Sequence, residues 1–389
     1  MAWTGVDCIG LYAYHRIPPL GSIFVGNTVS AAIRSILIAR CNIMKVLIAE
    51  FFWQHTEVIG TWLEFFSRQG ADITIYYPEF ENNTHNYIHI WAKLFKFKFD
   101  TTGQLNLGEY DLILFNTIAK KMLEKLFTIF PTTRFLVVGH YSAHSIADIF
   151  DTIHLQRICE LPVNPFFSCR SATASLPLAL RSATRADVAD LPPSQPAKFI
   201  LPVCRQLADA VADCRSATAD NVSNKKILII GNSFKSTPPN AFNFLIKILQ
   251  EEKYTLSAIL YGYNDISGYD FTSINVKRDL PAIDLYKEIE ECRFILFLPA
   301  DYHYFNQLSG AIPLSLTFGR PLITIANVLA PYNIQSFYNI DDEVLLQHLE
   351  SVDRYKEAQA YMQVRLNEIF ATNAEILEDS LRSIGLTSN

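Results

Sequence analysis

The chain has 389 residues, of which 50% are hydrophobic and 19% are charged. This composition excludes an intrinsically disordered chain, and the length is enough for two domains with a core each. The formal net charge of −6 argues against a nucleic-acid-binding surface, so we expect no nucleic acid among the partners.

We interpret residues 1–43 as an appended N-terminal extension. Its segment from Gly21 to Cys41 is fairly apolar, but Asn27 and Arg34 interrupt it. A membrane-spanning helix needs about 20 predominantly apolar residues, so the segment is a poor candidate for a span. A degenerate signal sequence is the alternative. We expect a cytoplasmic protein without an integral membrane span, and the sequence leaves peripheral membrane contact open.

Strand and helix patterns alternate over residues 44–167, which we take as the first domain. Short apolar runs predict strands at Lys45–Ala49, Ala71–Tyr76, Tyr110–Phe115 and Arg134–Val138. Apolar residues at helical spacing predict helices at Glu57–Arg68 and Ile118–Phe130. Such alternation is typical of a doubly wound α/β domain with a mostly parallel sheet.

The amino-acid composition changes at residues 168–223, which are rich in Ala, Arg, Ser, Asp and Thr. A short repeat recurs there, at Cys169–Ala174, Leu180–Arg185 and Cys214–Ala219. The repeat is too short and irregular for a solenoid, so we interpret the region as an interdomain linker with inserted low-complexity repeats. A docking module is the alternative. We expect residues 168–198 and 205–222 to form no part of either core.

A second alternating series over residues 224–389 predicts a second Rossmann-like domain. Strands are expected at Lys226–Ile230, Leu256–Tyr261, Arg293–Leu298 and Pro321–Ile325. Helices are expected from the Pro238-Pro239 pair to Glu251, at Leu285–Cys292, and from Asp341 to about Leu381, where a C-terminal helix closes the domain.

The most informative stretch runs from Asn306 to Ile325. A helix is expected to open near Ser309-Gly310 and to stop at Gly319, which would point its N-terminal N–H groups at a phosphate. The order small-Gly-x-x-Pro, followed by Gly-x-Pro before an apolar run, resembles the nucleotide-sugar half of a B-type glycosyltransferase. The resemblance covers about residues 44–167 and 224–381.

This resemblance implies two Rossmann-like doubly wound domains facing a cleft, the first for the acceptor and the second for the donor. It implies a metal-independent hexosyltransferase-class enzyme that moves a sugar from a nucleotide-diphosphate sugar to a hydroxyl of a glycan or small molecule. The donor is then a substrate, and no cofactor is expected. Seven scattered cysteines, without a Cys-x-x-Cys pair or a metal-spaced His/Cys cluster, favour a reducing compartment and no metal site.

Ligands of such folds bind at the carboxyl ends of the strands, which selects two groups of donor-binding candidates. The first group follows the first strand of the second domain and comprises Gly231, Asn232, Ser233 and Lys235. Glycine lets a diphosphate approach the backbone, and lysine neutralises it. An ordinary strand-to-helix turn with a solvated lysine explains this first group equally well.

The second group of donor-binding candidates precedes or opens the motif helix and comprises Tyr304, Asn306, Gln307, Ser309 and Gly310. A plain serine N-cap, worth about 1 kcal/mol, is the alternative for Ser309. We favour a phosphate site, because this loop also offers polar and aromatic groups together.

Two histidines are the catalytic candidates. Inverting transfer needs a general base on the acceptor hydroxyl, and neutral imidazole suits that role near pH 7. His55 follows the first strand and is our first choice, and His140 follows a later strand. A single histidine is more often a structural residue than a catalytic one.

The sequence departs from the family at two positions. Many B-type members carry an acidic residue five positions before the Gly of Gly-x-Pro, where this chain has Leu314. Retaining members carry a second acidic residue eight positions before the first, where this chain has Asn306. A non-catalytic relative that only binds is therefore the main alternative. An epimerase of the same fold would normally need more carboxylates, and no Gly-x-Gly-x-x-Gly supports a dehydrogenase.

Overall fold

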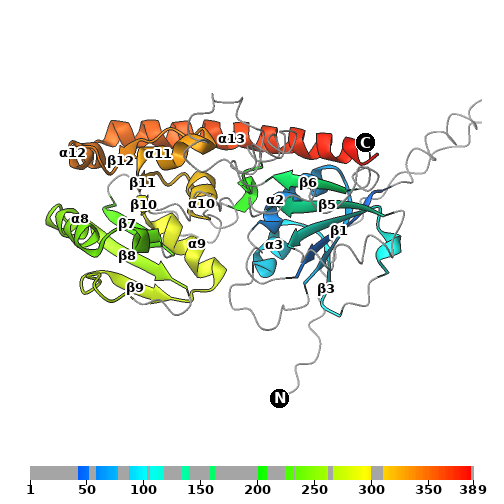
Figure 1. Cartoon of the computed structure of the whole chain (residues 1–389), viewed down its shortest axis with the longest axis horizontal. Helices are drawn as coiled ribbons and strands as arrows, with labels where there is room; N and C mark the ends of the chain where they lie inside the picture. The colour runs from blue at the N-terminus through cyan, green and yellow to red at the C-terminus, as the bar shows by residue number, and fades with distance from the viewer. Residues whose placement is uncertain are drawn as a thin grey trace, which may run out of the picture. The chain divides into compact units, whose positions relative to one another are not determined.

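The chain separates into two compact units, Met1–Ile43 and Met44–Asn389. The second unit contains both β-sheets (Figure 1). The computed structural model describes residues 43–51, 58–77, 87–102, 106–117, 133–139, 158–162, 200–207, 224–231, 233–261, 266–298 and 310–386. Among the helices in these ranges, none is long and apolar enough to cross a membrane.

The first sheet has the order β3-β2-β1-β4-β5-β6. Every pair of neighbours is parallel. Because the strand order reverses between β1 and β4, a ligand crevice is expected at the carboxyl ends of these two strands. The strands are β1 (Lys45–Glu50), β2 (Asp72–Tyr76), β3 (Lys98–Asp100), β4 (Leu112–Thr117), β5 (Arg134–Gly139) and β6 (Ile158–Pro162).

Two described helices, α2 (Ile59–Arg68) and α3 (Ile88–Leu94), accompany this sheet, with a 3-10 turn, η3, at Leu107–Glu109. Gly60 of α2 allows α2 and α3 to pack closely against each other. A Cβ on Gly60 would lie 2.4 Å from the indole ring of Trp91, which is fully buried. Only a residue without a side chain lets the α2 backbone approach that ring.

The second sheet has the order β12-β11-β10-β7-β8-β9, again with all neighbours parallel. Counted within its own domain, this order is the same as in the first sheet. The strands are β7 (Lys226–Ile230), β8 (Thr255–Leu260), β9 (Asn275–Arg278), β10 (Phe294–Leu296), β11 (Leu322–Thr324) and β12 (Tyr338–Asn339).

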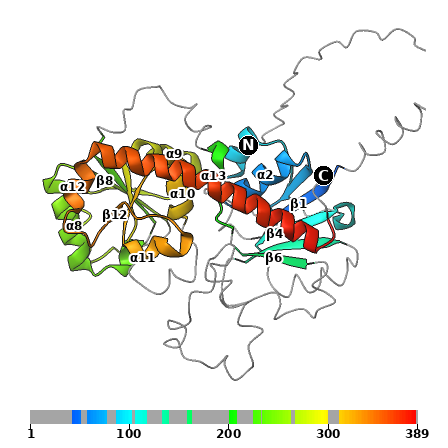
Figure 2. The ribbon, with the colours of Figure 1, turned by 90° about the horizontal axis from the view of Figure 1, so that it is seen from above.

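The helices of the second sheet follow the alternation that the sequence predicts (Figures 1 and 2). They are η7 (Ser233–Ser236), α8 (Pro239–Glu251), α9 (Ala282–Glu291), α10 (Ala311–Phe318), α11 (Ala326–Leu329), η9 (Ala330–Tyr332), α12 (Leu345–Glu350) and α13 (Val352–Ser383). The two sheets and their helices confirm the predicted fold class, an α/β protein with two Rossmann-like domains.

Aromatic residues fill the core of the second domain. Phe234, Phe242, Tyr269 and Phe271 contact one another with ring centroids 5.0 to 5.6 Å apart. Three of the five contacts are edge-on, the geometry that ring quadrupoles favour. These rings therefore build a core.

A short segment, residues 200–207, packs against both α2 and α13. The Asn373 side chain of α13 exchanges two hydrogen bonds with the backbone of Leu201, of 2.8 and 3.1 Å. On the α2 side, Thr61 donates to the Val203 carbonyl at 3.1 Å. Leu207 is 3% exposed and belongs to the core, so the prediction that residues 205–222 lie outside both cores is wrong at its start.

The C-terminal region is two helices, and the prediction of one continuous helix from Asp341 is wrong. Helix α12 ends at Glu350, and Ser351 caps α13 by accepting a hydrogen bond from the Arg354 N–H at 3.2 Å. The apolar spacing runs through the break, so only the serine cap signals it.

Candidate functional site

The second sheet reverses its strand order between β7 and β10, so its ligand crevice is expected at their carboxyl ends. Gly231 lies there, directly after β7, and its N–H donates to the Ile259 carbonyl at 2.8 Å. Its φ of 69° falls in the left-handed region, which glycine adopts without steric cost. The chain therefore turns sharply at this edge with no side chain in the way.

Helix α10 begins at the same edge, because it follows β10. Gly310 is its N-cap, makes no side-chain cap and has open space where a Cβ would be. Gly319 ends the helix with a φ of 58°. The predicted opening near Ser309-Gly310 and the predicted stop at Gly319 are both confirmed. The helix dipole places a partial positive charge at a helix N-terminus.

Lys235 is exposed on η7, the short turn between β7 and α8. Its backbone carbonyl accepts a hydrogen bond from the Tyr269 hydroxyl at 3.2 Å, which ties η7 to the aromatic core. The topology thus brings three candidates, Gly231, Lys235 and Gly310, to segments that follow neighbouring strands. The backbone of Ser233 belongs to η7 as well.

The remaining sequence-predicted site residues lie outside the described part of the chain, and their roles stay predictions. They are the catalytic candidates His55 and His140 and the donor-binding candidates Asn232, Tyr304, Asn306, Gln307 and Ser309.

Leu314, where the sequence departs from the B-type pattern it resembles, lies one turn into α10, and its N–H donates to the Gly310 carbonyl at 3.2 Å. Its side chain packs, partly buried, against the apolar core. A residue that faces the core offers no acceptor to a ribose hydroxyl.

The carboxyl edge of the first sheet carries a polar network that sequence reasoning missed. Glu50 ends β1 and is fully buried, and both of its carboxylate oxygens accept hydrogen bonds, from the Asn116 amide and the Thr117 hydroxyl. The Trp62 indole N–H donates to the Asn116 amide oxygen at 2.9 Å. The signal was present: polar residues end two otherwise apolar strands at the point where the strand order reverses.

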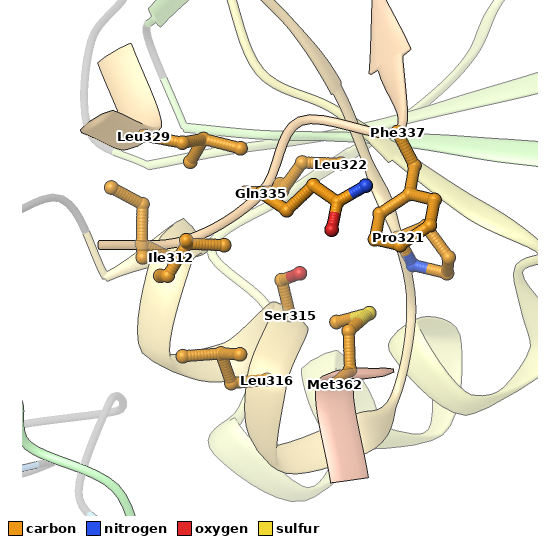
Figure 3. A pocket seen from close by; sticks show the side chains of 10 residues that line it. Ile312, Ser315, Leu316, Pro321, Leu322, Leu329, Gln335, Phe337 and Met362 are labelled. Carbon is orange, nitrogen blue, oxygen red and sulfur yellow. The ribbon is translucent and has the colours of Figure 1, made fainter. Parts of the chain in front are cut away.

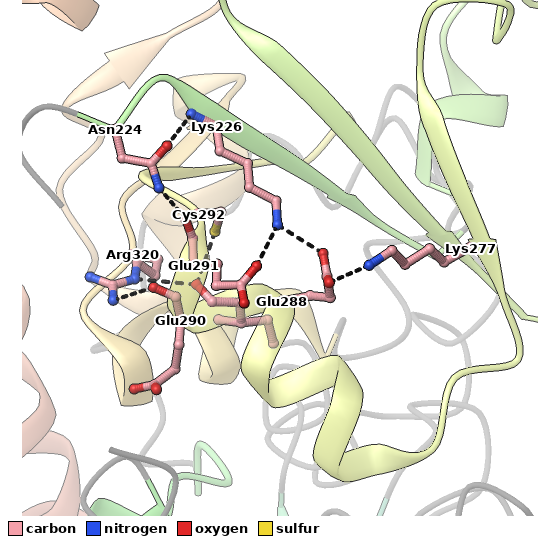
Figure 4. Close-up of polar contacts among 9 residues, drawn as sticks. Asn224, Lys226, Lys277, Glu288, Glu290, Glu291, Cys292 and Arg320 are labelled. Carbon is pink, nitrogen blue, oxygen red and sulfur yellow. Dashed lines mark hydrogen bonds and ion pairs between the residues drawn. The ribbon is translucent and has the colours of Figure 1, made fainter. Parts of the chain in front are cut away.

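At the amino end of β7, charged residues form a paired cluster around the buried Glu288 (Figure 4). Lys226 donates to Glu288 and Glu291, both at 2.9 Å, and Lys277 also donates to Glu288. Burial alone would raise the pKa of Glu288, but the hydrogen bonds from the two lysines outweigh it and hold that pKa below its usual range. Paired charges of this kind fix β7 to α9.

Arg320, 5% exposed, completes this cluster. Its guanidinium donates to the Ile289 carbonyl at 3.2 Å and to the Glu290 carbonyl at 2.8 Å (Figure 4). These are terminal carbonyls of α9, where a cation also interacts favourably with the helix dipole. The Cys292 thiol beside them is fully buried, and burial raises its pKa to about 12, so it is not a reactive thiol.

A small pocket lies beside α10 (Figure 3). Apolar side chains such as Ile312, Leu329 and Met362 line it, and the Ser315 hydroxyl at its floor donates to the Arg320 carbonyl at 2.7 Å. Pro321 and Leu322, at the amino end of β11, form one wall. The pocket therefore does not belong to the carboxyl edge where a donor is expected.

Across the described ranges, no group of three His, Cys, Asp or Glu side chains is arranged to hold a metal ion.

Comparison with known proteins supports the fold. No protein-family model matches the sequence, and no curated protein matches it. Among solved structures, the glycosyltransferase AviGT4, involved in avilamycin A biosynthesis, is 12% identical with a TM-score of 0.52, covering 88% of this chain and 98% of its own.

Two further solved structures align over a similar length. The T4 phage enzyme BGT, in complex with its UDP-glucose substrate, is 11% identical with a TM-score of 0.47, over 88% of this chain and all of its own. The glycosyltransferase SnogD from Streptomyces nogalater is 14% identical with a TM-score of 0.41, over 87% of this chain and all of its own. The chain has the two-Rossmann-domain fold of the B-type glycosyltransferases, in a divergent form.

Proposed function

We propose that the protein is a glycosyltransferase that moves a sugar from a nucleotide-diphosphate sugar to a hydroxyl acceptor without a metal ion. Two features support this function: a fold shared with AviGT4, and a strand order that reverses at two carboxyl edges. Fold alone is an analogy, so the proposal depends on the site.

The observation that carries the proposal is the position of the α10 N-terminus, with Gly310 as its N-cap, at the carboxyl edge of the second sheet. A Cβ added at Gly310 would meet nothing within 4 Å, and Gly231 turns the neighbouring strand end with a φ of 69°. Backbone N–H groups and the helix dipole together favour a diphosphate. In the proposed reaction they stabilise the negative charge that develops on the leaving diphosphate, which is the role a metal has in other transferases.

Substitution of Gly310 tests this role. Gly310→Asp places a negative charge in front of the helix N-terminus and should abolish donor binding, whereas the isosteric, neutral Gly310→Asn should retain most of it. Gly310→Ala adds only a methyl group in open space and is the steric control. Calorimetric titration with the common nucleoside diphosphates measures all three. Equal affinity in the Asp and Asn variants would overturn the assignment.

A second candidate function, a binding protein without catalysis, has one observation in its favour. Leu314 faces the core at the position where many family members carry a donor-binding carboxylate. A panel of nucleotide sugars, assayed for donor hydrolysis and for transfer, separates the two. Turnover of any of them supports the transferase, and binding without turnover supports the rival.

Turnover measured with a chelator and with added metal ions tests metal independence. We expect the same turnover in excess EDTA as in Mg²⁺ or Mn²⁺, because the helix N-terminus would take the place of a cation at the diphosphate. Loss of turnover in EDTA that added metal restores would contradict this part of the proposal and leave the transferase function standing.

A further inference from the structure

Arg293 directly precedes β10 at the amino end of the second sheet and is 3% exposed. Its guanidinium carbon lies 5.1 Å from the centroid of the Phe294 ring and 4.9 Å from the centroid of the Tyr355 ring of α13. Both distances are within the range of cation–π attraction. The rings attract the positive charge, but they offer no oxygen acceptor to the N–H groups that carry it.

One edge of the Arg293 guanidinium has no acceptor. Nε and Nη2 are both buried, and neither has a hydrogen-bond partner among the residues that the structure describes. These two nitrogens lie on the same edge of the guanidinium, where their N–H groups can bind one anion with two hydrogen bonds. A charged donor that is buried without an acceptor is among the costliest groups in a protein interior.

Two other arginines of the same domain show how this edge is satisfied by the protein itself. Nε and Nη2 of Arg354 both donate to the Phe337 carbonyl, at 2.9 and 2.8 Å. The same two nitrogens of Arg320 donate to two terminal carbonyls of α9, at 3.2 and 2.8 Å. Arg293 is buried as deeply as Arg320, yet within the described ranges no carbonyl or carboxylate faces its edge.

The Tyr338 hydroxyl is a further donor beside this edge. Tyr338 begins β12, is fully buried, and its ring contacts the Phe294 ring with centroids 4.9 Å apart. Its hydroxyl also has no hydrogen-bond partner in the part of the chain that the structure describes. Burial raises the pKa of Tyr338, and the positive charge of Arg293 acts against that rise, so the two groups are within electrostatic reach.

The charges around these residues do not balance. Lys225 pairs with Glu350 at 2.7 Å, and Glu357 is exposed to solvent on α13. Burial alone would raise the pKa of Glu350, but the hydrogen bond from Lys225 and the nearby charge of Arg293 lower it. Glu350 is thus attracted by Arg293 without bonding to its Nε or Nη2. The positive charges of Arg293 and Arg354 remain in excess.

We propose that Arg293 and Tyr338 form a buried anion site at the amino end of the second sheet, which takes a small monovalent anion of the halide class, such as chloride. Two N–H groups of Arg293 and the Tyr338 hydroxyl are its donors. A halide suits the site better than a phosphate, because the donors are enclosed by aromatic rings and one negative charge balances one guanidinium. The anion joins β10, β12 and α13, and its role is independent of the proposed function.

Thermal unfolding of the full chain tests the site. At constant ionic strength, replacing gluconate by chloride should raise the Tm by about 2 °C or more, because a ligand that binds only the folded state stabilises it. Bromide should act as chloride does. In a crystal soaked with bromide, the anomalous signal should lie within hydrogen-bond distance of Nε and Nη2 of Arg293.

Three variants locate the response. Arg293→Met keeps a long side chain without its charge and should abolish the difference between chloride and gluconate. Arg354→Met is the matched control, because the edge of that guanidinium already has an acceptor, and it should keep most of the difference. Tyr338→Phe removes only the hydroxyl and should weaken the apparent affinity for chloride by about threefold to tenfold.

Equal Tm values of the wild type in chloride and in gluconate would overturn the inference. This comparison needs no variant, so it decides the matter even if Arg293→Met does not fold. A chloride response that persists in folded Arg293→Met would overturn it as well. Glu350→Gln should keep the response; a response that appears only in this variant would show that the Glu350 carboxylate, and not a free anion, occupies the edge.

Discussion

The two ends of the second sheet are built from different residues. At its amino end, Lys226, Glu288 and Arg320 are buried or half-buried and paired with one another or with helix carbonyls. At its carboxyl end, Gly231 turns the chain and Gly310 opens α10, with no side chain on either. One end is closed by ion pairs, and the described residues at the other end include a glycine after β7 and a glycine at the start of α10.

In the proposed transferase, this difference separates the residues that stabilise the domain from those that bind the donor. The amino-end contacts join β7, α9 and the start of β11, so they are made in the folded state whether or not a ligand is present. The carboxyl-end glycines contribute little packing, and their proposed role is to let a diphosphate approach the backbone. Substitutions at the two ends should therefore change different measurements, and a variant that changes both would break the distinction.

The largest expected effect is on stability, from Arg320→Ala. Removing the guanidinium takes a charged, buried donor away from the Glu290 carbonyl and from the Ile289 carbonyl, which keeps the Cys292 N–H and thiol. We expect the free energy of unfolding to fall by about 3 kcal/mol, measured by urea denaturation. Nucleotide affinity of the folded protein should not change. Arg382→Ala, an exposed pair with Asp379 on α13, is the control and should have no measurable effect.

Glu288→Gln should cost less, about 2 kcal/mol near pH 7, because it removes the charge on which two lysines converge. The pKa of Glu288 is lowered on folding, so its contribution is complete above about pH 5 and disappears as the pH falls through the folded value.

The partner lysine sets the alkaline limit of that effect. Burial alone would lower the pKa of Lys226, but its hydrogen bonds to Glu288 and Glu291 raise it overall. Its contribution is therefore lost only above about pH 10. The stability difference between wild type and Glu288→Gln should be widest between about pH 5 and pH 10. A difference that persists unchanged at pH 3 would show that the ion pairs are not its source.

The smallest expected effects on stability come from alanine substitutions at the two carboxyl-end glycines, and the two should differ. Gly231→Ala should lower the free energy of unfolding by about 1 kcal/mol, because a side chain at a φ of 69° is strained although nothing crowds it. Gly310→Ala, at a φ of −58°, should have almost no effect on thermal unfolding. If both substitutions destabilise the protein equally, Gly310 must be constrained by contacts of its own that the turn at Gly231 does not share.

The ends of helices can be predicted from the sequence where proline or glycine residues mark them. The Pro238-Pro239 pair predicts the start of α8, and the structure begins it at Pro239, where a missing N–H costs nothing. Gly319 predicts the end of α10, and its left-handed backbone provides it. Both signals are local, so they can be seen without knowing what lies next to them in space.

The sequence does not predict the role of a residue when that role depends on partners far away in the chain. Glu50 is one polar residue at the end of an apolar strand, and only the pairing of β1 with β4 brings it to Asn116 and Thr117. Leu207 was placed in a linker by the composition of its surroundings, yet tertiary packing buries it. Composition describes a window of sequence, whereas burial depends on what the fold places next to each residue.

The last helix constrains how the protein can be made. Arg134, at the start of β5, bonds the carbonyl of Ile384, 250 residues further along the chain, and Asn373 of the same C-terminal region holds Leu201. A ribosome adds about 5–20 residues per second, so β5 waits roughly 10 to 50 seconds for this partner. The first domain therefore cannot complete its contacts during its own synthesis, and a chain that stops before α13 would lack the contacts of Arg134 with Ile384 and of Leu201 with Asn373.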